Sequence, residues 1–203
     1  MNLLTDFPIA YESFDHIEPK GTMHDNTHHK LFVDRVNEIS SGNKIKFADL
    51  GCSGGGLVKD FLDDGHDAIG IEGSDYSQRN KRAEWATIPD NLFTADITKP
   101  FFIVTDNSTG QCDIITAWDV LEHIHEIDLG VLITNIRNNL KTNGLFVASV
   151  ATFEDHPHHV TLKDRDWWLS IFKKYKMIDA GEGFFGLDHM VRQSSFYLVL
   201  KKV

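Results

Sequence analysis

The segment DLGCSGGG, residues 49–56, carries residue types suited to binding a polar group of a small molecule. Its glycines permit a tight turn and a close approach of the backbone, and a helix after such a turn offers unpaired N–H groups to a ligand. Glu72 ends the next apolar run about 20 residues after Gly51, where a carboxylate can accept hydrogen bonds from both ribose hydroxyls. A plain glycine-rich turn would explain the glycines alone, but together with Glu72 they predict nucleoside binding.

Two residues of this segment indicate which nucleoside. A dinucleotide-binding loop has glycine where this chain has Ser53, because the pyrophosphate must approach the backbone there. Asp49 would repel a pyrophosphate and attract the α-ammonium group of an amino acid. The expected ligand therefore carries a ribose, a base and a cationic amine, and S-adenosylmethionine fits this description.

The segment TAWDVLEHIHE, residues 116–126, contains a candidate proton acceptor. The imidazole of His123, with an ordinary pKa near about 6.5, can take a proton from an oxygen or nitrogen atom at neutral pH. Glu122 beside it is the second candidate for this chemistry. The alternative is that both side chains only hydrogen-bond to a neighbouring loop and maintain its shape.

A third segment, FEDHPHHVT at 153–161, places three histidines around Pro157. We expect His159 to take part in proton transfer and His156 and His158 to contact the substrate. The alternative is a solvated loop whose imidazoles hydrogen-bond locally.

Short apolar runs alternate with amphipathic segments from Lys44 onward, which predicts βαβ units and hence an α/β, Rossmann-like, doubly wound sheet with helices on both faces. Strands are expected at 45–50, 67–72, around 92–93, at 112–118, 145–150, 176–185 and 194–203, and helices at 57–65, 77–86, 126–140 and 165–175. Ligands bind such sheets beyond the carboxyl ends of the strands. The segments described above follow these ends.

The chain is expected to form a single compact unit with an N-terminal extension at 1–43 and a main domain at 44–203. A helix starting near Thr27, with Asn26 or Thr27 as its cap, is expected within the extension. Met23, His24 and Asn26 would cover the cofactor or the substrate, or the extension would only brace the edge of the sheet.

Composition excludes several classes of protein. The 203 residues are 41% hydrophobic and 25% charged with a net charge of −10, which disfavours binding to a polynucleotide. No apolar run is long enough for a membrane helix, and the N-terminus lacks the pattern of a secretion signal, so a cytoplasmic protein without a membrane partner is expected. Two cysteines, Cys52 and Cys112, cannot form a disulfide framework or a four-cysteine zinc site.

The motifs FADLGCSGGG, IGIEGSD, FTADI and CDIITAWDVLEHI, in this order, make residues 44–203 resemble the class I S-adenosylmethionine-dependent methyltransferases. The resemblance implies a seven-stranded sheet whose last strand is antiparallel to the rest. It also implies that Asp49, Gly51, Cys52 and Ser53 hold the methionine part of the cofactor. Glu72 and Gly73 would contact the ribose, Asp96 and Ile97 the adenine, and Trp118 and Asp119 the cofactor or the substrate.

The portion WDVLEHI is similar to the corresponding segment of ubiquinone-type O-methyltransferases. In that branch, and in a branch acting on small RNA ends, carboxylates and histidines gather a divalent metal. Asp119, Glu122, His123 and His158 would be the ligands here, but Asp119 is one methylene shorter than the usual glutamate, and we expect no metal.

The expected function is methyl transfer to an oxygen or nitrogen atom of a small polar acceptor, with S-adenosylhomocysteine as the product. Two alternatives remain. One is a catalytically silent nucleoside-binding domain, and the other, less favoured, is an NAD(P)-dependent oxidoreductase.

Overall fold

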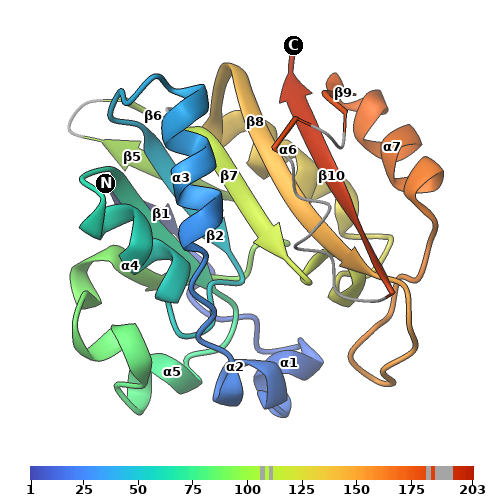
Figure 1. Cartoon of the computed structure of the whole chain (residues 1–203). Coiled ribbons are helices and arrows are strands. Elements are labelled where there is room, and N and C mark those ends of the chain that lie inside the picture. Colours follow the sequence, from blue (N-terminus) through green and yellow to red (C-terminus); the bar gives the residue numbers. More distant parts are fainter. Residues whose placement is uncertain (106–107, 110–111, 182–183, 186–193) are drawn as a thin grey trace.

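A seven-stranded sheet with the order β4-β3-β2-β7-β8-β10-β9 forms the centre of the computed structural model, which describes residues 1–105, 108–109, 112–181, 184–185 and 194–203 (Figure 1). β4, β3, β2, β7 and β8 pair in parallel, whereas β10 is antiparallel to both β8 and β9. The predicted sheet with an antiparallel last strand is confirmed. The strands are β2 (Lys46–Leu50), β3 (Asp67–Glu72), β4 (Leu92–Thr94), β7 (Cys112–Trp118), β8 (Leu140–Ala151), β9 (Met177–Asp179) and β10 (Ser195–Lys202).

Helices cover both faces of this sheet, which leaves the central strands buried on two sides and explains their nearly continuous apolar runs (Figure 1). On one face lie α3 (Lys30–Ile39) and α4 (Gly56–Asp63), where Phe32 and Phe61 pack with Phe47 in one core cluster. On the other lie α6 (Leu129–Asn139) and α7 (Arg165–Lys174), and Trp168 and Phe172 of α7 are fully buried there.

The N-terminal residues form elements of their own. β1 (Asn2–Thr5) pairs antiparallel with β5 (Phe101–Thr105), which pairs with β6 (Ser108–Thr109) in a second, three-stranded sheet. Two short helices follow, α1 (Phe14–Ile17) and α2 (Lys20–His24). The extension is thus anchored at its start by β1, which the sequence did not predict.

Several local predictions were wrong. The helix expected at 77–86 is divided into α5 (Tyr76–Arg79) and the 3₁₀ helix η1 (Ala83–Ala86), because Lys81 and Ala83 adopt positive φ angles of 47° and 48°. The strand expected at 176–185 is limited to β9 among the described residues, and positions 182–183 lie outside them. The helix expected from 126 begins at Leu129, and the strand expected from 145 begins at Leu140.

The start of α3 also differs from the prediction. The helix begins at Lys30, and neither Asn26 nor Thr27 caps it. Instead, the backbone N–H of His29 donates to the carboxylate of Asp60 on α4 at 2.6 Å. A distant acidic side chain therefore replaces the local cap.

Cys52 and Cys112 are both free and buried. Among the described residues, none of the helices has the length and apolar character needed to cross a membrane.

Candidate active site

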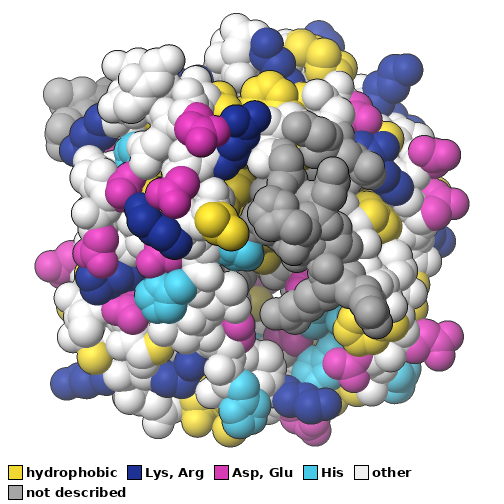
Figure 2. Space-filling model, in the orientation of Figure 1, with side chains coloured by type: hydrophobic (Ala, Val, Ile, Leu, Met, Phe, Trp, Pro, Cys, Tyr) yellow, Lys and Arg dark blue, Asp and Glu magenta, His cyan; other side chains and the backbone are white. Residues whose placement is uncertain are grey.

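A cavity of about 1050 Å³ lies beyond the carboxyl ends of the parallel strands. Its walls come from the loops after β2, β3, β4, β7 and β8 and from the N-terminal extension. In the space-filling view, acidic and histidine side chains border a hollow below the centre of the molecule (Figure 2). Every catalytic, cofactor-binding or substrate-binding residue predicted within residues 44–203, with the exception of Glu122, lines this cavity. Its size exceeds the needs of one small ligand, so a cofactor and an acceptor fit together.

The glycine-rich loop between β2 and α4 can adopt its course only with glycine at particular positions. Gly51 has a φ of 73°, and a Cβ there would collide with the side chain of Val120. A Cβ at Gly54 would collide with Asn26 of the N-terminal extension. The thiol of Cys52 borders the cavity, and its pKa is raised well above the ordinary value by burial and by the charges of Glu72 and Asp49.

Ser53, the residue that departs from the dinucleotide pattern, has a structural reason for being serine. Its Oγ donates to the carbonyl of Asp25 at 3.0 Å and accepts from Nη2 of Arg82 at 3.1 Å. Its backbone N–H donates to Oε2 of Glu72 at 2.8 Å. Ser53 therefore ties the loop to the N-terminal extension, a contact that glycine could not make.

Two buried carboxylates face the cavity from the ends of β2 and β3. Asp49 is 5% exposed, and its Oδ1 accepts from Thr116 Oγ1 at 2.6 Å. Burial raises the pKa of Asp49 to about 7, with further contributions from the charges of Asp25 and Glu72. Glu72 is 6% exposed and accepts from Ser53, Ser74 and Thr22, and burial raises its pKa as well. An ammonium group placed here would relieve this concentration of buried acid.

Asp96, Trp118 and Asp119 also reach the cavity. Oδ1 of Asp96 accepts from the backbone N–H and the hydroxyl of Thr98, which fixes the turn after β4. Oδ1 of Asp119 accepts from Ser149 Oγ at 2.6 Å. Nε1 of Trp118 is buried without a hydrogen-bond partner in the described part of the chain.

Glu122 is placed differently from the other predicted residues. It is fully buried in the 3₁₀ helix η3 (Leu121–His123), and its Oε1 accepts from the backbone N–H of Ala151 at 2.9 Å. Its backbone carbonyl accepts from Val160 and Thr161. Burial raises the pKa of Glu122 to about 7, and its Oε2 has no partner among the described residues. These contacts hold the histidine-containing loop against η3.

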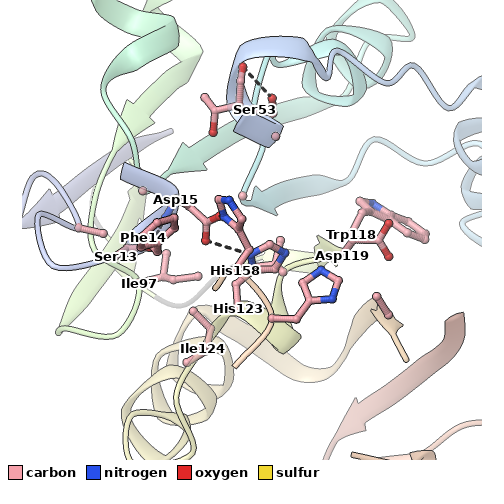
Figure 3. Close-up of a pocket in the computed structure, with 18 of the residues that line it drawn as sticks. Ser13, Phe14, Asp15, Ser53, Ile97, Trp118, Asp119, His123, Ile124 and His158 are labelled. Atoms are coloured by element: carbon pink, nitrogen blue, oxygen red, sulfur yellow. Dashed lines mark hydrogen bonds and ion pairs between the residues drawn. The ribbon is translucent and has the colours of Figure 1, made fainter. Parts of the chain in front are cut away.

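His123 and His158 meet at a carboxylate that the sequence did not indicate. Asp15 of α1 lies between them, with Oδ2 at 2.9 Å from His123 Nδ1 and Oδ1 at 2.7 Å from His158 Nδ1 (Figure 3). His123 also contacts His159, with ring centroids 4.8 Å apart. Nδ1 of His159 donates to the carbonyl of Phe153 at 2.7 Å. The only sequence signal for Asp15 is its place two residues after Ser13, the cap of α1.

The four metal ligands considered from the sequence do not form one group. Among the described residues, ligand atoms lie within 4.8 Å of one another in two sets, Asp15 with His123 and His158, and Glu122 with His123 and His159. Asp119 belongs to neither set. Both nitrogen atoms that point at Asp15 are at hydrogen-bonding distances from it.

The N-terminal extension borders the cavity next to Glu72, but not with the residues expected. Gly21, Thr22 and Asp25 line the cavity, whereas Met23, His24 and Asn26 do not. The hydroxyl of Thr22 donates to Oε1 of Glu72 at 3.2 Å.

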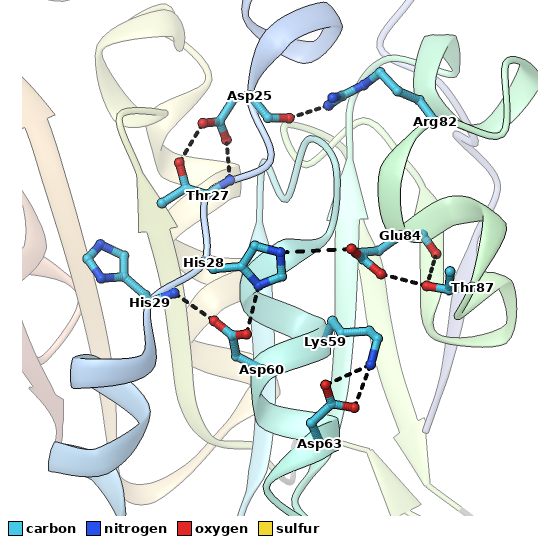
Figure 4. A network of polar contacts seen from close by, with 10 residues as sticks. All are labelled: Asp25, Thr27, His28, His29, Lys59, Asp60, Asp63, Arg82, Glu84 and Thr87. Carbon is cyan, nitrogen blue, oxygen red and sulfur yellow. Dashed lines mark hydrogen bonds and ion pairs between the residues drawn. The ribbon is translucent and has the colours of Figure 1, made fainter.

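Further contacts fasten the extension to the main domain (Figure 4). Nδ1 of His28 lies 2.7 Å from Oδ1 of Asp60, and its Nε2 lies 3.8 Å from Oε1 of Glu84. Arg82 donates to the carbonyl of Asp25. The extension therefore forms part of the site.

The sheet order, the glycine-rich loop and the acidic strand ends facing one cavity define a Rossmann-like domain with a ligand-sized cavity at the carboxyl ends of its parallel strands. Residues 23–183 match the model of a family described as a methyltransferase domain. This match spans well over half of the chain, and the chain belongs to that family. A search of curated proteins found no match.

Solved structures share the fold at low sequence identity. An S-adenosylmethionine-dependent methyltransferase from Clostridium acetobutylicum has a TM-score of 0.63 and 15% identity, over 95% of this chain and 98% of that one. The 1,6-didemethyltoxoflavin-N1-methyltransferase of Burkholderia thailandensis, with bound 1,6-didemethyltoxoflavin and S-adenosylhomocysteine, has a TM-score of 0.61 and 13% identity, over 93% and 84%. The magnesium protoporphyrin IX methyltransferase of Synechocystis, with bound SAH, has a TM-score of 0.60 and 16% identity, over 94% of each chain.

Proposed function

We propose that this chain binds S-adenosylmethionine and transfers its methyl group to an oxygen or nitrogen atom of a small polar acceptor. The observation that carries the proposal is the common cavity shared by Asp49, Glu72 and Asp96, the carboxylates at three successive strand ends. Structures with the same fold contain S-adenosylhomocysteine, which supports the same cofactor class here.

The residues present suit each part of the cofactor. Asp49 would hold the α-ammonium group. Burial raises the pKa of this carboxyl group to about 7, and a cationic partner would stabilise its ionised form. Glu72 would accept hydrogen bonds from the ribose hydroxyls in place of the one from Thr22. Asp96 would accept from the adenine amino group, with Ile97 packed on the ring. When bound, the cofactor supplies a methyl group on a positively charged sulfur.

The acceptor would lie on the histidine side of the cavity, near Phe14, His123 and Phe153. In the transfer, the bond from the methyl carbon to sulfur breaks and a bond to the acceptor oxygen or nitrogen forms. The sulfur becomes neutral, and the proton of the acceptor passes to His123 and then to solvent. The protein contributes alignment of the two reactants, a site shielded from water and a proton acceptor.

Two alternative functions would give different results in binding and activity assays. A catalytically silent domain would bind the cofactor without methylating anything, and an NAD(P)-dependent oxidoreductase would bind NAD in preference. Ser53 and Asp49 both disfavour a pyrophosphate in the loop, so we expect S-adenosylhomocysteine to bind and NAD not to bind.

Isothermal titration calorimetry with S-adenosylhomocysteine and with NAD tests the cofactor. Incubation with methyl-labelled S-adenosylmethionine and a panel of phenols, alcohols, amines and carboxylic acids tests the reaction. Product labelled on an oxygen or nitrogen atom of any of these acceptors supports the proposal. Cofactor binding without any labelled product would favour the silent domain, and tighter binding of NAD would overturn the proposal.

A further inference from the structure

Asp15 reaches the histidines because the N-terminal extension folds a short helix against the histidine-containing loop. Ser13 caps α1 by accepting from the backbone N–H of Asp15 at 3.2 Å. The neighbouring ring of Phe14 packs edge-on against His158, with centroids 5.1 Å apart. The cap and the aromatic contact set the direction of the Asp15 side chain between the two imidazoles (Figure 3).

A carboxylate that contacts two imidazoles decides where each ring carries its proton. An ionised carboxylate only accepts hydrogen bonds, so the nitrogen facing it must carry hydrogen. Both contacts are made by Nδ1, at 2.9 Å for His123 and 2.7 Å for His158. In the neutral state each ring is then protonated on Nδ1, and its Nε2 keeps a free lone pair. No residue in the described ranges gives either Nε2 a hydrogen-bond partner.

The local charges favour this arrangement. Burial acts to raise the pKa of Asp15, but the hydrogen bonds and charges of the two histidines outweigh it and lower the pKa. Burial acts to lower the pKa of His123, but the hydrogen bond and charge of Asp15 outweigh it and raise the pKa. The other titratable groups that face His123 are Glu122 and Asp119 beside it in the chain and His158 and His159 from the loop.

We propose that Asp15 is a positioning residue that holds His123 and His158 in the Nδ1–H tautomer, so that Nε2 of His123 is the proton acceptor in methyl transfer. The second part rests on the proposed function. Thr22 of the same extension contacts Glu72, so one N-terminal segment supplies both the residue that orients the base and a residue that contacts the acid at the end of β3.

Long-range ¹H–¹⁵N correlation spectra of the full chain test the tautomers without cofactor or acceptor. The His123→Gln and His158→Gln variants assign the two rings. Both rings of the wild-type protein should carry hydrogen on Nδ1 when neutral. In Asp15→Asn the side-chain amide accepts from one ring but donates to the other, so one of the two rings should change to the Nε2–H tautomer. The Nε2–H tautomer in either neutral ring of the wild type would overturn the proposal, and this result does not depend on whether Asp15→Asn folds.

Turnover tests the second part, using labelled S-adenosylmethionine and a panel acceptor that is methylated. Asp15→Asn should lower kcat by about tenfold or more, as expected for loss of an oriented base, and leave the affinity for S-adenosylhomocysteine within about twofold. Its pH–rate profile should shift its acidic limb to lower pH. Glu18→Gln, which removes an exposed carboxylate next to α1, should change neither quantity.

An unchanged kcat in Asp15→Asn, or a parallel loss of cofactor affinity, would show a merely structural role and refute the proposal. If no panel acceptor is methylated, the proposed function fails, whereas the spectra still decide whether Asp15 fixes the tautomers.

Discussion

Replacing Asp49 by asparagine should stabilise the ligand-free protein and weaken its cofactor binding. In the ligand-free protein this carboxyl group has a pKa of about 7, raised first by burial, against 3.8 for the ordinary side chain. Because the folded state has the higher pKa, it holds more protons than the unfolded state between about pH 4 and 7. The free energy of unfolding therefore falls as the pH rises through this window.

The size of this effect follows from the shift in pKa. A difference of about three pKa units corresponds to about 4 kcal/mol at about pH 8, as an upper value. Asparagine retains the shape and can still accept from Thr116, but it has no charge to bury. We expect Asp49→Asn to be more stable than wild type at about pH 8 by roughly 2–4 kcal/mol, and the difference should shrink to nearly zero at about pH 4, as measured by urea denaturation.

Cofactor binding should show the opposite consequence. The ammonium group of S-adenosylhomocysteine needs the ionised form of Asp49, so wild-type affinity should fall about tenfold between about pH 8 and pH 6. Asp49→Asn should bind more weakly at both values and lose this dependence. Asp67→Asn serves as the matched control. Asp67 is a half-exposed residue at the start of β3, at the end of the strand away from Glu72, and this variant should behave like wild type in calorimetry. An Asp49→Asn protein that is less stable at about pH 8, or that binds S-adenosylhomocysteine as tightly as wild type, would refute the reasoning.

Three further substitutions test other parts of the site. Glu72→Gln should weaken S-adenosylhomocysteine binding by about 1–3 kcal/mol through the hydrogen bonds of the ribose, and unchanged affinity in calorimetry would exclude the ribose contact. Ser53→Gly removes the contacts with Asp25 and Arg82, so limited proteolysis should cut the N-terminal extension faster than in wild type. Equal cleavage rates would contradict this. Glu122→Gln removes a buried acid whose pKa is about 7 against 4.5 ordinarily, so it should gain roughly 2–3 kcal/mol at about pH 8 and little at about pH 5 in denaturant titration.

The strands and helices of the main domain could be predicted because short stretches of neighbouring residues determine most of them. Apolar runs such as 112–118 are long enough to identify a buried strand, and the glycine-rich loop marks the switch from strand to helix. The acidic residues at strand ends were assigned to one crevice because parallel strands bring their carboxyl ends to the same edge.

The errors arose where distant residues decide a local structure. The cap of α3 comes from Asp60, about 30 residues away in the chain, so no pattern near Thr27 could indicate it. The helix breaks between α5 and η1 at Lys81, which has a positive φ angle. The next residue, Arg82, donates hydrogen bonds to Ser53 and to the carbonyl of Asp25. Such contacts exist only once the N-terminal extension is folded against the loop.

Asp15 was missed for the same reason, and it shows what kind of information a sequence motif omits. The motif TAWDVLEHIHE and the loop 153–161 identify His123 and His158 as chemically active types, but not which nitrogen of each ring faces a substrate. That choice is made by a carboxylate more than about 100 residues earlier in the chain, in a helix of four residues.

Part of the chain's negative charge is concentrated on the acidic side chains in and around the cavity. The negative charges of Asp25 and Glu72 raise the pKa of the buried carboxyl group of Asp49. The ionised form of Asp49 is therefore unfavourable in the ligand-free protein, because each charge raises the free-energy cost of ionising the next group. A ligand with a cationic amine removes this cost on binding, whereas a pyrophosphate increases it. The same charges that lower the stability of the empty site therefore favour a cationic ligand over a dinucleotide. Substituting Asp49 by asparagine should therefore both increase the stability of the ligand-free protein and weaken its preference for a cationic ligand over a dinucleotide, because the same buried negative charge causes both effects.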